Sequence, residues 1–286
     1  MTIAITGASG SLGRTTAELL LKTVDPRDVV LTTRRPETLA DLAGAGADVR
    51  RADFSDPASL PEAFAGVERL LLISTDAVGA RVDQHRAAIA AATAAGVGHI
   101  VYTSVPEPVP ANPAMVVPDH AATEAALRES SATWTFLRNN LYAELQIGGV
   151  QAALTSGRFP TNAGTGAAAY VSREDCAAAA AAVLTQDGHA GRIYDVTGPV
   201  AVRSADIATL AGALGNRHVE LVEVDDAGFA TQLRGAGLPD GAVELVVSFG
   251  AATREGFLST ATTTVEELTG RTPISTADVV RRALGR

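Results

Sequence analysis

A glycine-rich loop near the start of the chain constrains the fold more than any other feature. Gly7, Gly10 and Gly13 have the spacing G-x-x-G-x-x-G, between an apolar run at residues 2–6 and a helical pattern at 11–22. In this setting the first glycine permits a tight turn, and the second lets the backbone of the loop approach a diphosphate. The third glycine lets the following helix pack closely on the preceding strand. Free N–H groups at the helix start favour bound phosphate. The loop therefore predicts a dinucleotide site, whereas an isolated match would indicate only a turn.

The first half of the chain alternates short β-branched runs with longer helical patterns. Strands are expected over residues 2–6, 29–33, 49–52, 70–74, 99–104 and 133–137, and helices over 11–22, 36–43, 58–64, 80–95 and 119–129. Runs such as LLLIS are apolar at consecutive positions, which is typical of strands covered by helices on both faces. The pattern predicts an α/β fold with a Rossmann-like, doubly wound parallel sheet.

Beyond residue 140 the alternation loosens. A helix at 141–154, a turn-rich stretch at 156–170, an alanine-rich helix from about 173 and a strand at 192–198 are expected. We therefore predict a dinucleotide-binding domain over 1–140, with 176–200 as a candidate addition, and a smaller C-terminal α/β substrate lobe over 141–286.

The residues expected to contact the dinucleotide lie in the glycine loop or where predicted parallel strands end. They are Gly7, Ser9, Gly10, Ser11, Leu12, Gly13, Arg34, Asp53, Phe54, Ser74 and Thr103. Asp53 and Phe54 follow the third strand and are expected beside the adenine, although Asp53 also suits a simple strand-end turn.

The end of the second strand decides which dinucleotide is preferred. An acidic side chain there would bind a free ribose 2′-hydroxyl, but the chain has Thr32, Thr33, Arg34 and Arg35. A guanidinium can pair with a 2′-phosphate. NADP(H) is therefore favoured, with NAD(H) and a merely solvated arginine pair as the alternatives.

Composition limits the other classes of function. The net charge is −9, from 23 basic and 32 acidic residues, so we expect neither a nucleic-acid partner nor a membrane partner. Cys176 is the single cysteine and is expected to be a buried structural residue, and the five histidines lack paired ligand spacing, so no metal site is expected. With no leader pattern at its start, the chain is expected in the cytoplasm, as a monomer or homodimer.

Several blocks of the sequence resemble one family. They are ITGASGSLG (5–13), VERLLLIST (67–75), QHRAAIAAATAAGVGHIVYTS (84–104), FLRNNLYAE (136–144) and IYDVTGP (193–199). Together they resemble the NmrA-like branch of the atypical short-chain dehydrogenases, and within it the NAD(P)H:quinone oxidoreductases of type 2. The resemblance implies a Rossmann-like domain that binds NADPH, a small lobe closing over a substrate cleft, and hydride transfer to a quinone or related aromatic carbonyl without flavin.

The chain departs from the wider superfamily at its catalytic segment. Ser104 stands where that superfamily has its serine, but the Tyr-x-x-x-Lys segment reads His120 to Glu124. An ordinary ketone needs a proton as hydride arrives, whereas a quinone delocalises the incoming charge and becomes aromatic. The departure is therefore compatible with quinone reduction.

The candidate catalytic residues are His120, Ser104 and Tyr142. His120 is a candidate proton donor or hydrogen-bond donor to a quinone oxygen, with Glu124 as the group that orients it; a histidine and a carboxylate at a helix start without function is the alternative. Tyr142 is a candidate for stacking on a flat substrate or hydrogen-bonding to it, and the alternative is an aromatic residue that anchors its helix to the core.

Three further expectations concern less conspicuous residues and the alternative functions. The proline-rich loop at 106–118 follows a strand end and is expected to border the substrate site. Gln84 and His85 are interpreted as structural. Two other functions stay open, namely a non-catalytic NAD(P) sensor of the NmrA type and a tailoring oxidoreductase of an aromatic biosynthetic pathway.

Overall fold

A computed structural model describes all residues, 1–286. The chain forms two compact units, each assembled from several segments. The first unit comprises Met1–Val105, Asp119–Arg138 and Glu174–Asp195, and the second comprises Pro106–Pro118, Asn139–Arg173 and Val196–Arg286. The proline-rich loop thus belongs to the second unit, and the strand near residue 192 returns to the first.

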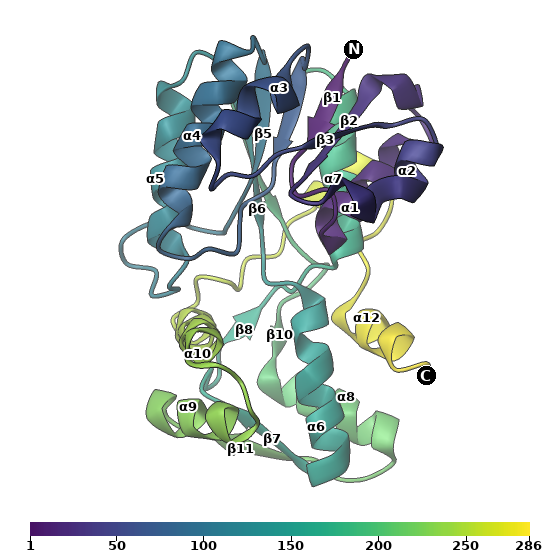
Figure 1. Ribbon diagram of the computed structural model, residues 1–286. Coiled ribbons are helices and arrows are strands. Elements are labelled where there is room, and N and C mark those ends of the chain that lie inside the picture. The colour runs from purple at the N-terminus through teal and green to yellow at the C-terminus, as the bar shows by residue number, and fades with distance from the viewer. The chain divides into compact units, whose positions relative to one another are not determined.

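The first unit is built on a seven-stranded sheet in the order β3-β2-β1-β4-β5-β6-β9 (Figure 1). The strands are β1 (Ile3–Ile5), β2 (Val29–Thr33), β3 (Asp48–Arg51), β4 (Arg69–Leu72), β5 (His99–Ser104), β6 (Thr133–Asn139) and β9 (Arg192–Val196). All pairs from β3 to β6 are parallel. The strand order reverses between β1 and β4, which confirms the predicted doubly wound fold and marks where such sheets bind ligands.

Helices cover both faces of this sheet. They are α1 (Ser11–Leu20), α2 (Ala40–Gly44), α3 (Leu60–Phe64), α4 (Arg81–Ala94), α5 (Val117–Glu129) and α7 (Arg173–Thr185). Side chains of α3, α4 and α5, among them Phe64, Ile89 and Leu127, form one core with Leu70 and Tyr102 of the sheet. Helices α1 and α7 lie on the other side of the sheet from α4 and α5 (Figure 1). Coverage of both faces explains why strands such as β1 and β2 are buried at every position.

Most expected elements form, with shifts of a few residues at their ends. The region expected as a helix at 36–43 divides into a 3₁₀ turn, Pro36–Leu39, and the short α2. Helix α7 begins at Arg173, as expected, and Cys176 in its first turns is buried. None of the helices has both the length and the apolar character needed to cross a bilayer.

The second unit differs from expectation in the turn-rich stretch. This stretch contains two strands, β7 (Arg158–Thr161) and β8 (Ala167–Ala168). Strand β7 pairs in parallel with β11 (Glu220–Glu223), and β8 pairs antiparallel with β10 (Val202–Arg203). The local composition of this stretch favoured turns. Its two strands were not expected because each pairs with a segment that lies far along the chain.

The remaining elements of the second unit are helical. They are a 3₁₀ turn at Ala143–Leu145, α6 (Gln146–Ser156), α8 (Ser204–Gly215), α9 (Asp226–Gly235), α10 (Asp240–Arg254), α11 (Thr264–Thr269) and α12 (Thr276–Ala283). The proline-rich loop is attached to α10, because the Met115 N–H donates to Ser248 Oγ at 3.1 Å. Asn112 braces the same loop by donating to the carbonyls of Pro106 and Glu107.

Candidate dinucleotide site and the polar face of α5

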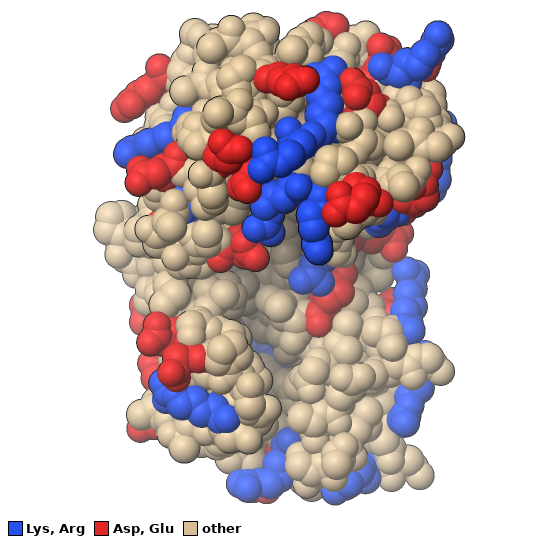
Figure 2. Space-filling model, viewed as in Figure 1, with Lys and Arg blue, Asp and Glu red and all other residues tan.

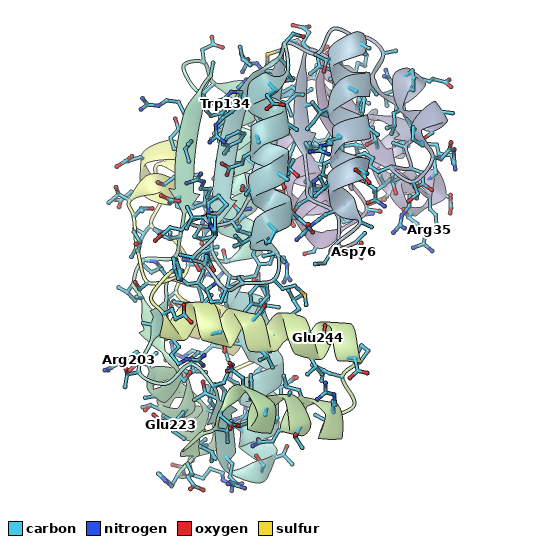
Figure 3. The ribbon with its side chains drawn as sticks, turned by 90° about the vertical axis from the view of Figure 1, so that its left-hand side faces the viewer. Arg35, Asp76, Trp134, Arg203, Glu223 and Glu244 are labelled. Carbon is cyan, nitrogen blue, oxygen red and sulfur yellow. The ribbon has the colours of Figure 1, made fainter.

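A cavity of about 330 Å³ opens in the first unit where β1, β2 and β4 end. Its lining comprises Thr6, Gly7, Ser9, Gly10, Thr32, Thr33, Arg34, Ala52, Asp53, Phe54, Ser55, Ile73, Ser74, Thr75, Asp76, Ala77 and Gln84. The cavity lies at the reversal of strand order, where an open α/β sheet leaves a crevice. Figure 3 shows Arg35 and Asp76 at this same edge of the unit.

The glycine loop has the geometry that close contact with a ligand needs. Gly7 has a φ of +60°, a conformation that residues with a Cβ rarely adopt. A Cβ on Gly13 would lie 2.4 Å from the Gly7 carbonyl oxygen and 2.8 Å from Ala8 Cα. Gly13 therefore permits the helix to pack on the strand, while the backbone of Gly7 and Gly10 lines the cavity.

The first turn of α1 is free to accept an anion. Gly10 precedes the helix, no side chain caps it, and its first turn holds no acidic residue. The leading N–H groups of a helix have no acceptor within it, and the helix dipole is positive there. Ser11, Leu12 and Gly13 form this turn and are not among the residues that line the cavity. Glycine backbone and uncapped helix start together fit a dinucleotide diphosphate.

The end of β2 supplies hydroxyls and a cation. The Ser9 and Thr33 hydroxyls lie 2.9 Å apart and tie the glycine loop to β2. Arg34 is exposed at the cavity and forms no ion pair, whereas Arg51 on the adjacent strand pairs with Asp56 at 3.1 Å. Figure 2 shows basic and acidic side chains interspersed over the β2 and β3 side of this unit. Arg34 is thus an unneutralised cation at the cavity edge.

Asp53 and Phe54, which follow β3, line the part of the cavity where the adenine is expected. The Asp53 carboxylate accepts from the Ser55 N–H at 2.9 Å, and its own N–H donates to Ser59 Oγ at 3.0 Å. Phe54 is half-buried against the core. Asp53 thus forms a local turn and lines the cavity as well, so the two interpretations of this residue are compatible.

Hydrogen bonds to side chains hold the cavity wall that follows β4. The Ser74 N–H donates to Thr103 Oγ1 at 2.9 Å, so Thr103 positions Ser74 without lining the cavity. The Thr75 hydroxyl donates to Gln84 Oε1 at 2.9 Å, and Gln84 Nε2 donates to Ser55 Oγ at 3.1 Å. Gln84, interpreted above as structural, also lines the cavity and bridges two of its walls.

Ten residues that line the cavity were not among those expected from the sequence. They are Thr6, Thr32, Thr33, Ala52, Ser55, Ile73, Thr75, Asp76, Ala77 and Gln84. Nine of them lie at or shortly after the end of a parallel strand, so the rule that selected Asp53 and Ser74 could have found them. Gln84 comes from a helix, and its side chain reaches the cavity only because α4 packs beside the loop after β4.

Helix α5 presents a polar face to β5, and its contacts correct one expectation. Ser104 Oγ donates to Glu124 Oε1 at 2.7 Å, and the Glu124 carboxylate, 2 % exposed, also accepts from Arg138 at 3.0 and 2.8 Å and from Arg128 at 3.1 Å. The expectation that Glu124 orients His120 is therefore wrong. The carboxylate lies one helical turn further along, opposite Ser104, where three side chains already share it.

His120 is paired with a tyrosine instead. Its Nδ1 lies 2.8 Å from the Tyr102 hydroxyl, and the side chain is buried. Burial, and then the charges of Arg81 and His85, hold the pKa of His120 well below its usual value. His120 is therefore neutral near pH 7.

A second pair of contacts on α5 anchors the loop after β4. Asp119 Oδ2 accepts from Arg81 Nε and from the Gly79 N–H, both at 2.9 Å. His85 Nε2 accepts from the Thr75 N–H at 3.1 Å, and burial, followed by the charge of Arg81, lowers its pKa to about 4. The cavity wall formed by this loop thus rests on buried groups of α4 and α5.

Tyr142 lies in the second unit. Its backbone forms a bridge with Val171, and the Arg173 guanidinium stands 4.5 Å from the centre of its ring. Arg173 also pairs with Glu144 at 3.7 Å. These contacts fix the ring within its own unit, and the role of Tyr142 toward a substrate stays a prediction.

Comparison with known proteins identifies the family. Residues 7–187 match the model of the NAD(P)H-binding family. The chain is 38% identical to quinone oxidoreductase 2 of Escherichia coli over 278 residues, 97% of either protein. It is 31% identical to an NmrA-like oxidoreductase of Aspergillus flavus over 98% of this chain and 94% of that one.

A solved structure agrees over the same length. The crystal structure of an NADPH-dependent quinone oxidoreductase of Escherichia coli with NADPH matches with a TM-score of 0.95 and 37% identity, covering 99% of this chain and 100% of that one. This chain belongs to the NAD(P)H-binding family and is an oxidoreductase of its NmrA-like branch. The predicted family, fold and cofactor class are thereby confirmed.

Proposed function

We propose that this protein reduces quinones with NADPH by direct hydride transfer, without flavin. The observation that carries the proposal is the polar face of α5, where His120 is neutral and Glu124 is enclosed by Ser104 and two arginines. This face offers no strongly acidic proton donor. A quinone tolerates that lack, and the near full-length similarity to quinone oxidoreductase 2 supports the same substrate class.

The first unit would hold the cofactor through the groups described above. The uncapped first turn of α1 and the backbone of Gly7 and Gly10 bind the diphosphate, and Arg34 pairs with the 2′-phosphate. Asp53 and Phe54 lie beside the adenine. Bound NADPH supplies a hydride, two electrons with one proton, and the quinone becomes a hydroquinone when a second proton arrives from water.

The remaining candidates act on the substrate side. His120 donates a hydrogen bond to a quinone oxygen, which is worth most as negative charge develops there. Ser104 already donates its proton to Glu124, so its contribution is to hold the end of β5 against α5. In the second unit, which is the proposed substrate-binding lobe, Tyr142 is the candidate for stacking on a flat aromatic ring.

The test is a turnover assay with the purified, flavin-free chain. NADPH oxidation is followed by absorbance with a series of benzoquinones and naphthoquinones, with and without added FAD. We expect turnover well above the enzyme-free rate and no gain from FAD. Rates that never exceed the enzyme-free control would remove the proposal, and tight NADPH binding without turnover would favour a sensor. Turnover that requires FAD would contradict direct transfer.

A further inference from the structure

We propose that Tyr102 is a positioning residue that holds His120 as the tautomer with its proton on Nε2. His120 then presents a neutral N–H to a carbonyl oxygen of the substrate. The inference rests on the proposed quinone reduction for its catalytic consequence, but the tautomer itself is a property of the protein alone.

Tyr102 is held rigidly in the core of the first unit. Its side chain is fully buried on β5. The ring packs edge-on against His85, with centroids 5.6 Å apart, and against Phe136, with centroids 6.4 Å apart. The hydroxyl is thereby fixed 2.8 Å from His120 Nδ1.

The direction of this hydrogen bond follows from where the available protons can go. Burial raises the pKa of the Tyr102 phenol above its usual range, so the phenol keeps its proton. His120 is neutral and carries one N–H. If Nδ1 carried it, the buried phenol proton would lose its nearest acceptor. If the phenol donates to Nδ1, the hydrogen bond is made and the imidazole proton lies on Nε2.

One other partner is open to the Tyr102 phenol, because hydrogen bonding with Thr123 opposes part of the rise in the Tyr102 pKa that burial causes. Thr123 is the other hydroxyl on this face of α5, and it donates to the Asp119 carbonyl at 2.8 Å. Its oxygen lies 2.9 Å from His85 Nδ1. His85 Nε2 must accept, because the Thr75 N–H points to it. His85 therefore carries its proton on Nδ1 and donates it to Thr123.

His85 and His120 are thus predicted to be opposite tautomers. His85 uses both ring nitrogens within the protein. His120 uses Nδ1 alone, and its Nε2 makes no hydrogen bond to the protein. That N–H is available to a carbonyl oxygen, and a neutral donor can stabilise charge arriving there without giving up its proton.

The tautomers can be measured directly. Protein labelled with ¹⁵N in the histidine rings, with NADP⁺ bound, gives two-bond ¹H–¹⁵N correlations that distinguish the two forms, and a His120→Gln variant assigns its signals. We expect His120 as Nε2–H and His85 as Nδ1–H. In Tyr102→Phe we expect His120 to lose its single tautomer while His85 keeps its own. A His120 proton on Nδ1 in the unmodified protein would overturn the inference.

Kinetics with a matched pair of variants tests the consequence. The amide nitrogen of glutamine resembles Nε2 in position, and that of asparagine resembles Nδ1. We expect His120→Gln to keep most of kcat and His120→Asn to lose about a hundredfold, the usual cost of removing one such donor, with NADPH Kd unchanged in both. Equal losses would contradict the Nε2 donor. If the unmodified chain reduces no quinone, the function fails while the NMR result still decides the tautomer.

Discussion

At the residue scale, the chemistry depends on which partner each polar side chain has. Glu124 and His120 occupy the two positions where related dehydrogenases have lysine and tyrosine, yet they do not contact each other. Glu124 is neutralised by Arg128 and Arg138, and His120 is paired with Tyr102. The resulting face is polar but contains no group that gives up a proton readily near pH 7. A substrate that needs little acid assistance suits this face.

Arg34 is expected to decide cofactor preference. Replacing it with alanine removes the unneutralised cation at the end of β2, so the Kd for NADPH should rise about tenfold or more, while the Kd for NADH changes little. Fluorescence titration with both cofactors measures this. Arg192→Ala is the matched control, because Arg192 lies on the edge strand β9 and is exposed. Equal losses for the two cofactors would remove Arg34 as the basis of preference.

At the element scale, the glycine loop and α1 act together. The helix can approach β1 because Gly13 lacks a Cβ, and Gly10, which directly precedes the helix, lines the cavity together with Gly7. On the opposite wall, α4 and α5 hold the loop after β4 through Arg81, His85 and Asp119. The cavity is therefore shaped by packing at both walls and not by the glycine loop alone.

Gly13→Ala is expected to damage both stability and binding. The added Cβ would overlap the Gly7 carbonyl, so the free energy of unfolding should fall by about 1–3 kcal/mol, and NADPH affinity should fall with it. Urea unfolding and cofactor titration measure the two effects. Gly44→Ala in α2 is the control, since nothing lies within 4 Å of its added Cβ. A Gly13→Ala variant as stable as the parent would show that helix and strand have room to separate.

At the scale of the whole molecule, stability is linked to pH through histidines that are buried neutral. The pKa of His85 falls from 6.5 to about 4 on folding, and that of His120 falls as well. Unfolded histidine binds a proton below about pH 6.5, whereas folded His85 does so only near pH 4. The stabilisation is therefore complete above pH 6.5 and is lost as the pH falls toward 4.

This loss is expected to amount to about 3 kcal/mol for His85 alone. Urea unfolding at a series of pH values should show the free energy of unfolding falling steadily through this window. In a His85→Gln variant, which titrates no proton at that position, the slope should be shallower. A parent protein whose stability is flat from pH 7 to about 4.5 would contradict the burial of neutral histidines.

The elements of the first unit could be predicted because their signals are local. Runs of β-branched residues gave β2 and β5 with correct bounds, and the glycine spacing placed the cavity at the end of β1. Strands β7 and β8 could not be found this way, since each is defined by a partner more than thirty residues away along the chain. The pairing of His120 with Tyr102 was missed because it depends on how α5 packs against β5.

By itself, the sequence determined the fold class, the dinucleotide loop, the cation at the end of β2 and the family, because each is written in adjacent residues or in fixed spacing. Only the tertiary structure decided that Glu124 accepts a hydrogen bond from Ser104 and that Gln84 reaches the cavity. It also decided that Tyr102 pairs with His120 and Thr123 with His85. Such contacts depend on how helix and strand are rotated about their axes when they pack, and no local pattern specifies that rotation.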